Sequence, residues 1–227
     1  MSIAEQEIPT LAHGDNLTRE EFIRIWDMHP EIKLAELIGG LVFMPPPTSI
    51  EHGESESDIG LWAGHYRVYT PGCASGHDVS CFLLDDLPQS DVNLRILPEY
   101  GGRSYEKDSL LAGIPEFFAE VCRSSVVYDL HQKKDLYEEA GIPEYLAILT
   151  TEREIRWHIL EDGKYRLLAP GHDGVHRSRI FPGLWLDGAA FLKRDMVQVL
   201  AVLQKGLDSE EHRAFVQRLQ EAKTKKN

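Results

Sequence analysis

The segment Phe117–Cys122 constrains the fold of this chain more than any other feature of the sequence. Five of its six residues are apolar, and a short apolar run of this kind is typical of a strand in the interior of a sheet. Helical spacing follows over Tyr128–Ala140, and Glu144–Leu149 forms a second apolar strand. Strands and helices that alternate in this way indicate a central sheet with helices on its faces.

Further elements extend this pattern toward both ends of the chain. Thr18–Glu21 is a capping box that opens a short helix. Two apolar runs around Gly39-Gly40 indicate a hairpin, which ends at Pro45–Pro47. The other expected elements are a helix from Ser49 to about Thr70 with Ile59, Trp62, Ala63 and Tyr66 on its apolar face, strands at Val79–Leu84, Asp91–Leu97, Glu154–Ile159 and Tyr165–Leu168, a polar loop at Pro98–Asp108, and helices at about Asp187–Gln204 and Ser209–Ala222.

Hairpins join some of these strands and helices join others, so the sequence predicts a mixed central sheet flanked by helices. The fold class is α/β or α+β, and the pattern alone does not decide between the two. No internal repeat or low-complexity linker divides the chain. We expect a loose segment over residues 1–16, one domain over residues 17–186, and a C-terminal helical extension over residues 187–227 that packs on the domain or on a partner.

The charge balance limits the classes of partner. Lys and Arg number 24 against 37 Asp and Glu, which gives a formal net charge of −13. A protein that coats nucleic acid through bulk charge needs a basic face, so this class is disfavoured, although a local basic groove or a bound metal could still supply positive charge. No apolar stretch approaches the roughly 18 residues of a membrane span, and the first residues lack the pattern of a secretory signal. We expect a cytoplasmic protein that does not enter a membrane.

Two charged residues fall at positions that should be buried. Glu120 has apolar neighbours in its strand, and a buried carboxylate is unstable unless a cation or hydrogen-bond donors receive it. Lys133 lies at the centre of an apolar helical stripe that includes Leu136 and Tyr137, and the strand end and the helix face could meet. Two plainer interpretations stay open. Glu120 could pair with an arginine in a buried salt bridge, and Lys133 could pack its stem while its ammonium reaches solvent.

Asp91 and Glu36 are weaker candidates on their own. Strand alternation puts Asp91, Asn93 and Arg95 on one face, but an acid at the start of a strand is often only a turn residue. A glutamate in a hairpin, such as Glu36, is usually a cross-strand partner or simply exposed.

A group of three carboxylates and a lysine nevertheless has a chemical use. Carboxylate oxygens are the hard ligands that Mg²⁺ and Mn²⁺ take. Such a metal lowers the pKa of a bound water and neutralises charge on a phosphate, while a lysine positions the water or stabilises the transition state.

At these residues the chain resembles the bacterial "putative restriction endonuclease" family, long catalogued as a domain of unknown function, within the PD-(D/E)XK nuclease superfamily. The resemblance runs from about Leu17 to Leu186. Its pieces are LTREEF, ELIGGLVFMPPP with His52 soon after, SDV, EVCRSS followed by YDLHQKKDLYEEAGIPEYLAI, and RSRIFPGLWLD with a closing leucine-rich helix. No piece identifies the family alone, but together, in this order and with this spacing, the pieces carry the resemblance.

The resemblance implies a restriction-endonuclease-like fold and a metal-dependent phosphodiesterase site at one edge of the sheet. Asp91 matches the first motif acid, Glu120 the second, and Glu36 the glutamate near the start. In many superfamily members the lysine lies two residues after the second acid, where this chain has Cys122. This family instead carries the lysine on the following helix, and Lys133 matches it.

The chain departs from the family pattern at several positions. Ser90 replaces the proline before the motif aspartate, and Cys-Arg-Ser-Ser follows Glu120 where a turn with proline is common. Gly39 and Leu41 replace an aspartate and a second glutamate of the hairpin, which thins the acidic group around Glu36. None of these changes removes a matched core residue.

Other signals carry less weight. His172 and His176 are four residues apart, but the nearby glycines and proline disfavour a helical metal site there. His52 matches a family histidine and could lie near the site. Three cysteines without a C-x-x-C pair disfavour a disulfide framework and a four-thiolate zinc site, and Cys122 has no evident activating partner.

The leading hypothesis is a Mg²⁺- or Mn²⁺-dependent endonuclease that hydrolyses DNA phosphodiesters. Asp91 and Glu120 hold the metal, Glu36 is a further ligand or orients the lysine, and Lys133 is the catalytic base or stabilises charge. A non-enzymatic binding or regulatory module with the same fold is the second hypothesis, and a metal-free hydrolase with a pair of acids is the third. Cutting both strands of a duplex usually needs two sites, so a homodimer is compatible with the first hypothesis, although no sequence feature requires it.

Overall fold

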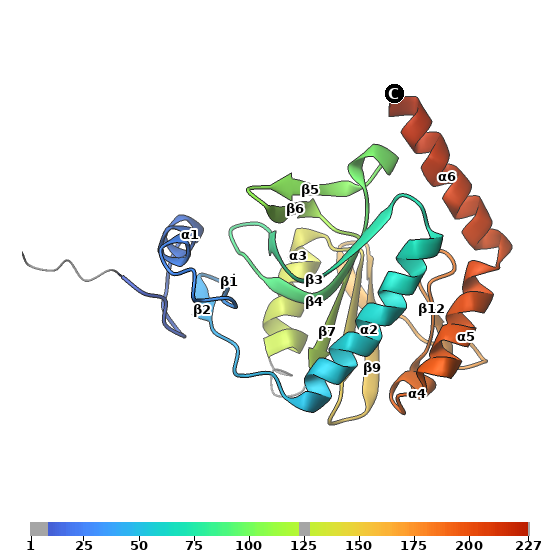
Figure 1. Ribbon diagram of the computed structural model, residues 1–227, viewed down its shortest axis with the longest axis horizontal. Coiled ribbons are helices and arrows are strands. Elements are labelled where there is room, and N and C mark those ends of the chain that lie inside the picture. Colours follow the sequence, from blue (N-terminus) through green and yellow to red (C-terminus); the bar gives the residue numbers. More distant parts are fainter. Residues whose placement is uncertain (1–8, 123–127, 227) are drawn as a thin grey trace, which may run out of the picture.

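A computed structural model describes residues 9–122 and 128–226 of the chain. Its centre is an eight-stranded sheet with the order β10-β9-β8-β7-β4-β3-β6-β5 (Figure 1). The strands are β1 (Glu36–Ile38), β2 (Leu41–Phe43), β3 (Cys73–Phe82), β4 (Gln89–Ile96), β5 (Arg103–Lys107), β6 (Leu110–Ile114), β7 (Phe117–Cys122), β8 (Glu144–Leu149), β9 (Glu154–Glu161), β10 (Lys164–Leu167), β11 (Val175–Arg177) and β12 (Trp185–Asp187). The helices are α1 (Arg19–Asp27), α2 (Ile50–Tyr69), α3 (Lys134–Ala140), α4 (Gly188–Phe191), α5 (Met196–Leu207) and α6 (Glu210–Lys226), with a 3₁₀ turn η1 (Pro98–Tyr100) and a π-helical turn η2 (Tyr128–Lys133).

The sheet is mixed, because β7 pairs with β8 and β3 with β6 in parallel while the other neighbours in the sheet are antiparallel. This confirms the predicted fold class. Strand β7 is buried along its whole length, as expected for an interior strand. The capping box at Thr18 is also confirmed, since its hydroxyl accepts from the Glu21 N–H and the Glu21 carboxylate accepts from the Thr18 N–H.

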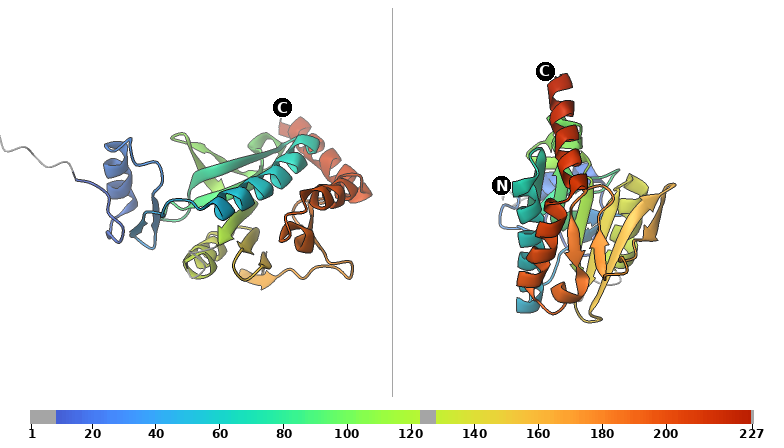
Figure 2. Two further views of the ribbon diagram at one scale, coloured as in Figure 1. Left: turned by 60° about the horizontal axis from the view of Figure 1, so that its bottom comes forward. Right: turned by 90° about the vertical axis from the view of Figure 1, so that its right-hand side faces the viewer.

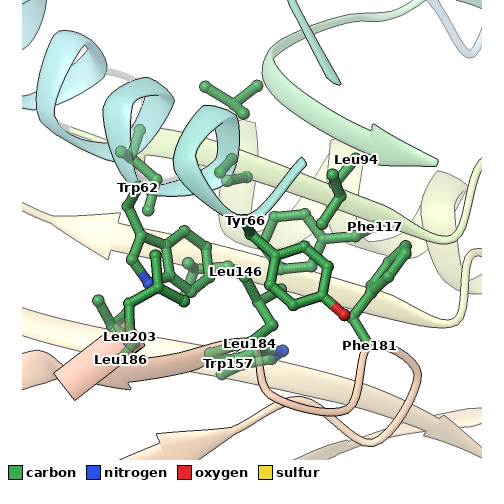
Figure 3. Close-up of a cluster of buried hydrophobic side chains, with 14 of the residues drawn as sticks. Trp62, Tyr66, Leu94, Phe117, Leu146, Trp157, Phe181, Leu184, Leu186 and Leu203 are labelled. Carbon is green, nitrogen blue, oxygen red and sulfur yellow. The ribbon is translucent and has the colours of Figure 1, made fainter. Parts of the chain in front are cut away.

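Alternation along β7 divides the two faces of the sheet. Phe117, Ala119 and Val121 pack beneath α2, and the residues between them face α3. The larger core lies on the α2 side, where Trp62 and Tyr66 of α2 meet Phe117, Trp157 and the C-terminal helices (Figure 3). Trp62 and Tyr66 also donate to the carbonyls of Trp185 and Pro182, which ties the last third of the chain to this helix.

The first helix and the β1–β2 hairpin form a separate small unit at one end of the molecule, far from α5 and α6 (Figures 1 and 2). Its apolar cluster includes Phe22, Leu37 and Val42 together with Leu87 from the tip of the β3–β4 hairpin. In place of the expected loose segment, Leu11 is buried and the Gly14 N–H donates to the Val42 carbonyl. Residues 1–8 lie outside the described part of the chain.

The prediction of a loop at Pro98–Asp108 is wrong, because this segment contains η1 and the edge strand β5. Four of the five side chains of β5 are exposed, so the strand lacks the apolar alternation by which strands are recognised. The β11–β12 hairpin and the first half of β3 were likewise not expected. The single helix expected at Asp187–Gln204 is two helices, since Arg194 has a positive φ of 61° and Asp195 caps α5.

The helix expected over Tyr128–Ala140 begins as the turn η2 and becomes α-helical at Lys134. Asp129, with Gln132 three residues later, has the sequence pattern of a capping box and predicts the N-cap of this helix, but its side chain lies outside the described part of the chain. Among the described residues, no helix has both the length and the apolar content to cross a lipid bilayer.

Candidate active site

Glu120 lies in the middle of β7 with 2% of its surface exposed. Two side chains of the following helix bind its carboxylate. The Lys133 ammonium donates to Oε2 at 3.2 Å, and the Tyr137 hydroxyl donates to Oε1 at 2.8 Å. Because these residues are four apart, they lie on one helical face, directed at the same carboxylate. The buried charge of Glu120 is therefore met by at least an ammonium and a hydroxyl from this helix.

Lys133 is itself buried and joins three elements. Besides Glu120, its Nζ contacts Glu36 Oε1 of β1 at 2.9 Å and donates to the carbonyl oxygen of Gln89 in β4 at 2.7 Å. Glu36 Oε1 also accepts from the Gln89 N–H at 2.6 Å. The alternative of a lysine head that reaches solvent is thus wrong, since the ammonium is enclosed between two carboxylates.

Asp91 lies on the strand beside Glu120. The register of β4 and β7 pairs Val92 with Ala119, which puts Asp91 and Glu120 next to each other on the same face. Asp91 Oδ2 accepts from the Val121 N–H at 2.7 Å. Its side chain is 19% exposed, so it forms the open end of an otherwise buried cluster.

The pKa of Asp91 depends on several neighbouring groups of the cluster. Loss of solvation raises the pKa of this carboxyl above its usual value, and the charge of Glu36 raises it further. Lys133, the Val121 N–H and His52 act in the opposite direction. The structure thus brings Glu36, Asp91, Glu120 and Lys133 together. Sequence reasoning named all four, while their catalytic roles stay predictions.

A second group of side chains borders Asp91 on the α2 side. His52 Nε2 lies 3.8 Å from Asp91 Oδ2 and 4.0 Å from Glu56 Oε2, and His77 Nδ1 lies 3.9 Å from Glu56 Oε1. Burial raises the pKa of Glu56 to about 7, with further contributions from Asp78 and Asp91. These separations are too long for direct hydrogen bonds, so the three side chains form a loose polar border.

Sequence reasoning considered His52 but missed Glu56 and His77. The four-residue spacing of His52 and Glu56 on one helical face was the available signal. No local pattern pointed to His77. Its ring lies against Gly60 of α2, where an added Cβ would come within 1.8 Å of His77 Cε1, and this contact depends on how the helix packs on β3.

The oxygen donors of the cluster fit a hard divalent cation. Mg²⁺ is commonly held by one or two carboxylates and keeps several waters. Asp91 and Glu120 would hold such an ion, because Asp91 is the most exposed of the three carboxylates and loss of solvation disfavours its ionised form. Within residues 9–122 and 128–226, no three metal-binding side chains are already arranged around one point. The Lys133 ammonium, between Glu36 and Glu120, keeps those two carboxylates apart.

Other residues weighed in the sequence lie elsewhere. His176 is buried in β11 and stacks on Trp157, with ring centroids 6.2 Å apart. Cys122 is fully buried, and its thiol contacts the Glu120 carbonyl oxygen. Glu144, at the start of β8, accepts from Ser178 Oγ and the Arg179 N–H at 2.7 Å each, so it anchors the chain before α4 rather than joining the site.

Comparisons with known proteins identify the family of the chain. The chain matches the family described as "Uma2: Putative restriction endonuclease" over residues 19–189, a range that includes all four residues of the cluster. A search of curated proteins found no match.

Among solved structures, the chain is similar to a "putative nuclease belonging to DUF820" from Anabaena variabilis ATCC 29413. The two share 14% sequence identity with a TM-score of 0.54, over 78% of this chain and 99% of that one. A likeness at this identity shows the fold alone.

Proposed function

Because the chain belongs to the Uma2 family of putative restriction endonucleases, we propose that it hydrolyses DNA phosphodiester bonds with the help of Mg²⁺ or Mn²⁺. The single observation that carries this proposal is the Lys133 ammonium, held 3.2 Å from Glu120 and 2.9 Å from Glu36 beside Asp91. Two acids on neighbouring strands can hold a divalent metal, and a lysine beside them can stabilise charge on a phosphate, so the set suits metal-assisted hydrolysis of a phosphodiester.

Each residue of the cluster has a definable task in the proposed reaction. Asp91 and Glu120 would hold the metal, which when bound supplies an activated water and neutralises charge on the phosphate. Tyr137 and Lys133 orient the Glu120 carboxylate from opposite oxygens. Lys133 has a second task, since an ammonium at this place stabilises negative charge that develops on the phosphate. Glu36 positions that ammonium.

Calorimetric titration of Mn²⁺ combined with cleavage of mixed plasmid and oligonucleotide substrates tests the proposal. We expect wild type to bind Mn²⁺ and to cut, and Glu120→Gln to lose both. Glu154→Gln is the matched control, because Glu154 is an exposed glutamate on β9 whose partner is Arg156. It should behave as wild type.

The net charge of −13 favours one rival, a module that keeps the fold and binds without cutting. Metal binding without cleavage of any nucleic acid would support that rival. Cleavage that persists in EDTA would instead support a metal-free hydrolase. Absence of metal binding in wild type would mean that the carboxylates have a structural role.

A further inference from the structure

A groove of about 220 Å³ opens beside the cluster on the sheet. Gly76 and Val79 of β3, Asn93 and Arg95 of β4, and Glu106 and Ser109 of the β5–β6 hairpin contribute to its lining. The register explains the opening. Strands β3 and β6 pair only at Cys81↔Leu111 and Phe82↔Ala112, so toward Ser109 they no longer pair and leave part of the sheet uncovered.

The groove continues the face that carries Asp91. Residues two apart on a strand share a face, so Asp91, Asn93 and Arg95 follow one another along β4. At about 3.4 Å per residue, the α-carbon of Arg95 lies roughly 13 Å from that of Asp91. A strand of nucleic acid that ran from Asp91 along β4 would pass over Asn93 and reach Arg95.

The floor of the groove is built from a buried amide and a glycine. Asn93 is 1% exposed, and its Nδ2 donates to the Gly76 carbonyl oxygen at 3.3 Å. A Cβ at Gly76 would come within 2.8 Å of Val79 Cγ2 and 3.0 Å of Asn93 Nδ2. The absence of a side chain at Gly76 thus keeps this floor open.

Arg95 is the cation of the groove. It is partly exposed, and among the described residues its guanidinium has neither an ion pair nor a hydrogen bond with a side chain or carbonyl. The arginines 156, 177, 179 and 194 each pair with a carboxylate instead. A partly buried guanidinium that faces a groove without a carboxylate partner is suited to an external anion, and its planar fork matches a phosphate.

We propose that this groove is a substrate subsite in which Arg95 binds a backbone phosphate of the same strand that is cut at Asp91. The inference rests on the proposed nuclease function and deepens it. Because the two α-carbons are well separated along β4, the phosphate that Arg95 binds flanks the cut rather than being the one that is hydrolysed. The groove is smaller than the roughly 300–1,000 Å³ that encloses a complete small-molecule ligand, which suits one phosphodiester group.

Glu106 is the opposing charge. It lies at the rim with its side chain exposed, where solvent screens it more than the partly buried Arg95. Substitutions at the two residues should therefore change the affinity for nucleic acid in opposite directions. Arg95→Ala should weaken the binding of nucleic acid, and Glu106→Gln should strengthen it.

Binding of a labelled oligonucleotide in EDTA, measured by fluorescence anisotropy at several salt concentrations, tests the subsite separately from catalysis. For Arg95→Ala we expect an affinity about ten- to a hundredfold lower and a salt slope smaller by about one. Arg95→Lys should recover only part of the loss. Arg166→Ala on β10, at the opposite edge of the sheet, is the control and should match wild type.

A second measurement locates the phosphate. Oligonucleotides with one neutral methylphosphonate, moved along the strand, should show one position at which wild type loses affinity and Arg95→Ala does not. Hydrolysis of bis(p-nitrophenyl) phosphate, which has no flanking nucleotide, should be equal in wild type and Arg95→Ala.

The outcomes separate the two proposals. Unchanged oligonucleotide binding by Arg95→Ala, or no binding by wild type, would overturn the subsite whatever the enzyme cuts. Binding with the expected Arg95 dependence but no cleavage in Mg²⁺ or Mn²⁺ would support the subsite and overturn the catalytic proposal.

Discussion

Lys133 and Glu36 belong to elements almost a hundred residues apart in the chain, yet the Lys133 Nζ lies 2.9 Å from Glu36 Oε1. The contact joins the small N-terminal unit to the helix that follows β7. Because the same ammonium binds Glu120, the position of Lys133 in the candidate site depends on both units. Contacts that hold β1 in place therefore help to position Lys133, through Glu36.

The first prediction concerns Lys133. Lys133→Ala leaves two carboxylates without the ammonium between them, so we expect cleavage to be lost and the free energy of unfolding to fall by about 3–5 kcal/mol. Denaturant unfolding and cleavage assays measure the two effects. Lys134→Ala is the control, because that ammonium is partly exposed and pairs with exposed Asp135. Wild-type cleavage by Lys133→Ala would remove Lys133 from the mechanism.

Much of this site could be predicted because its central residues lie on regular elements. Alternation along β7 placed Glu120 inside, and the 3.6-residue period placed Lys133 on the buried face of the helix. The family resemblance supplied the order in which these pieces combine, with Asp91 as the first acid.

The parts of the fold and site that could not be predicted depend on packing between segments far apart in the sequence. The contact of Glu36 with Lys133 requires the hairpin β1–β2 to dock beside β4, and no local pattern encodes that distance. His77 was missed for the same reason, since it meets Glu56 only where α2 crosses β3. Edge strand β5 was missed because its side chains face solvent and carry no apolar period.

The second prediction concerns metal binding. A cation that binds the folded protein alone raises stability by about 2.7 kcal/mol at a hundred times its dissociation constant, which for a chain of this size is a shift of several degrees. We expect Mn²⁺ to raise the unfolding temperature of wild type and of Glu154→Gln, and EDTA to reverse the shift. Asp91→Asn should abolish it. An equal shift in Asp91→Asn would mean that the ion binds elsewhere.

The third prediction follows from buried Glu144, whose pKa burial raises from 4.5 to about 7. Between these two values the folded protein holds more protons at this residue than the unfolded chain does, so the free energy of unfolding falls as the pH rises through this range. Glu144→Gln cannot ionise. Its stability relative to wild type should therefore increase from pH 4.5 to pH 7, by at most about 3 kcal/mol.

Denaturant unfolding in EDTA at several pH values measures this difference. Glu56, which titrates in the same range, is present in both proteins and cancels. A constant difference between Glu144→Gln and wild type across the range would contradict the raised pKa of Glu144.

The last prediction concerns the device that holds Glu36. Asp86, in the turn between β3 and β4, accepts from the Gly39 N–H at 2.9 Å and from the Gly40 N–H at 3.4 Å, so it fixes the β1–β2 turn to the sheet. Gly39 and Gly40 both have positive φ angles, and this turn leaves their N–H groups directed at the carboxylate.

Asp86→Ala should loosen the hairpin and displace Glu36 from Lys133, while the core beneath α2 stays intact. We expect several-fold slower cleavage with a loss of only about 1 kcal/mol in the free energy of unfolding. The neighbouring Asp85→Ala is the matched control, since Asp85 is exposed in the same turn and should leave both quantities unchanged. Equal cleavage rates for the two variants would show that Glu36 keeps its position without the Asp86 contact.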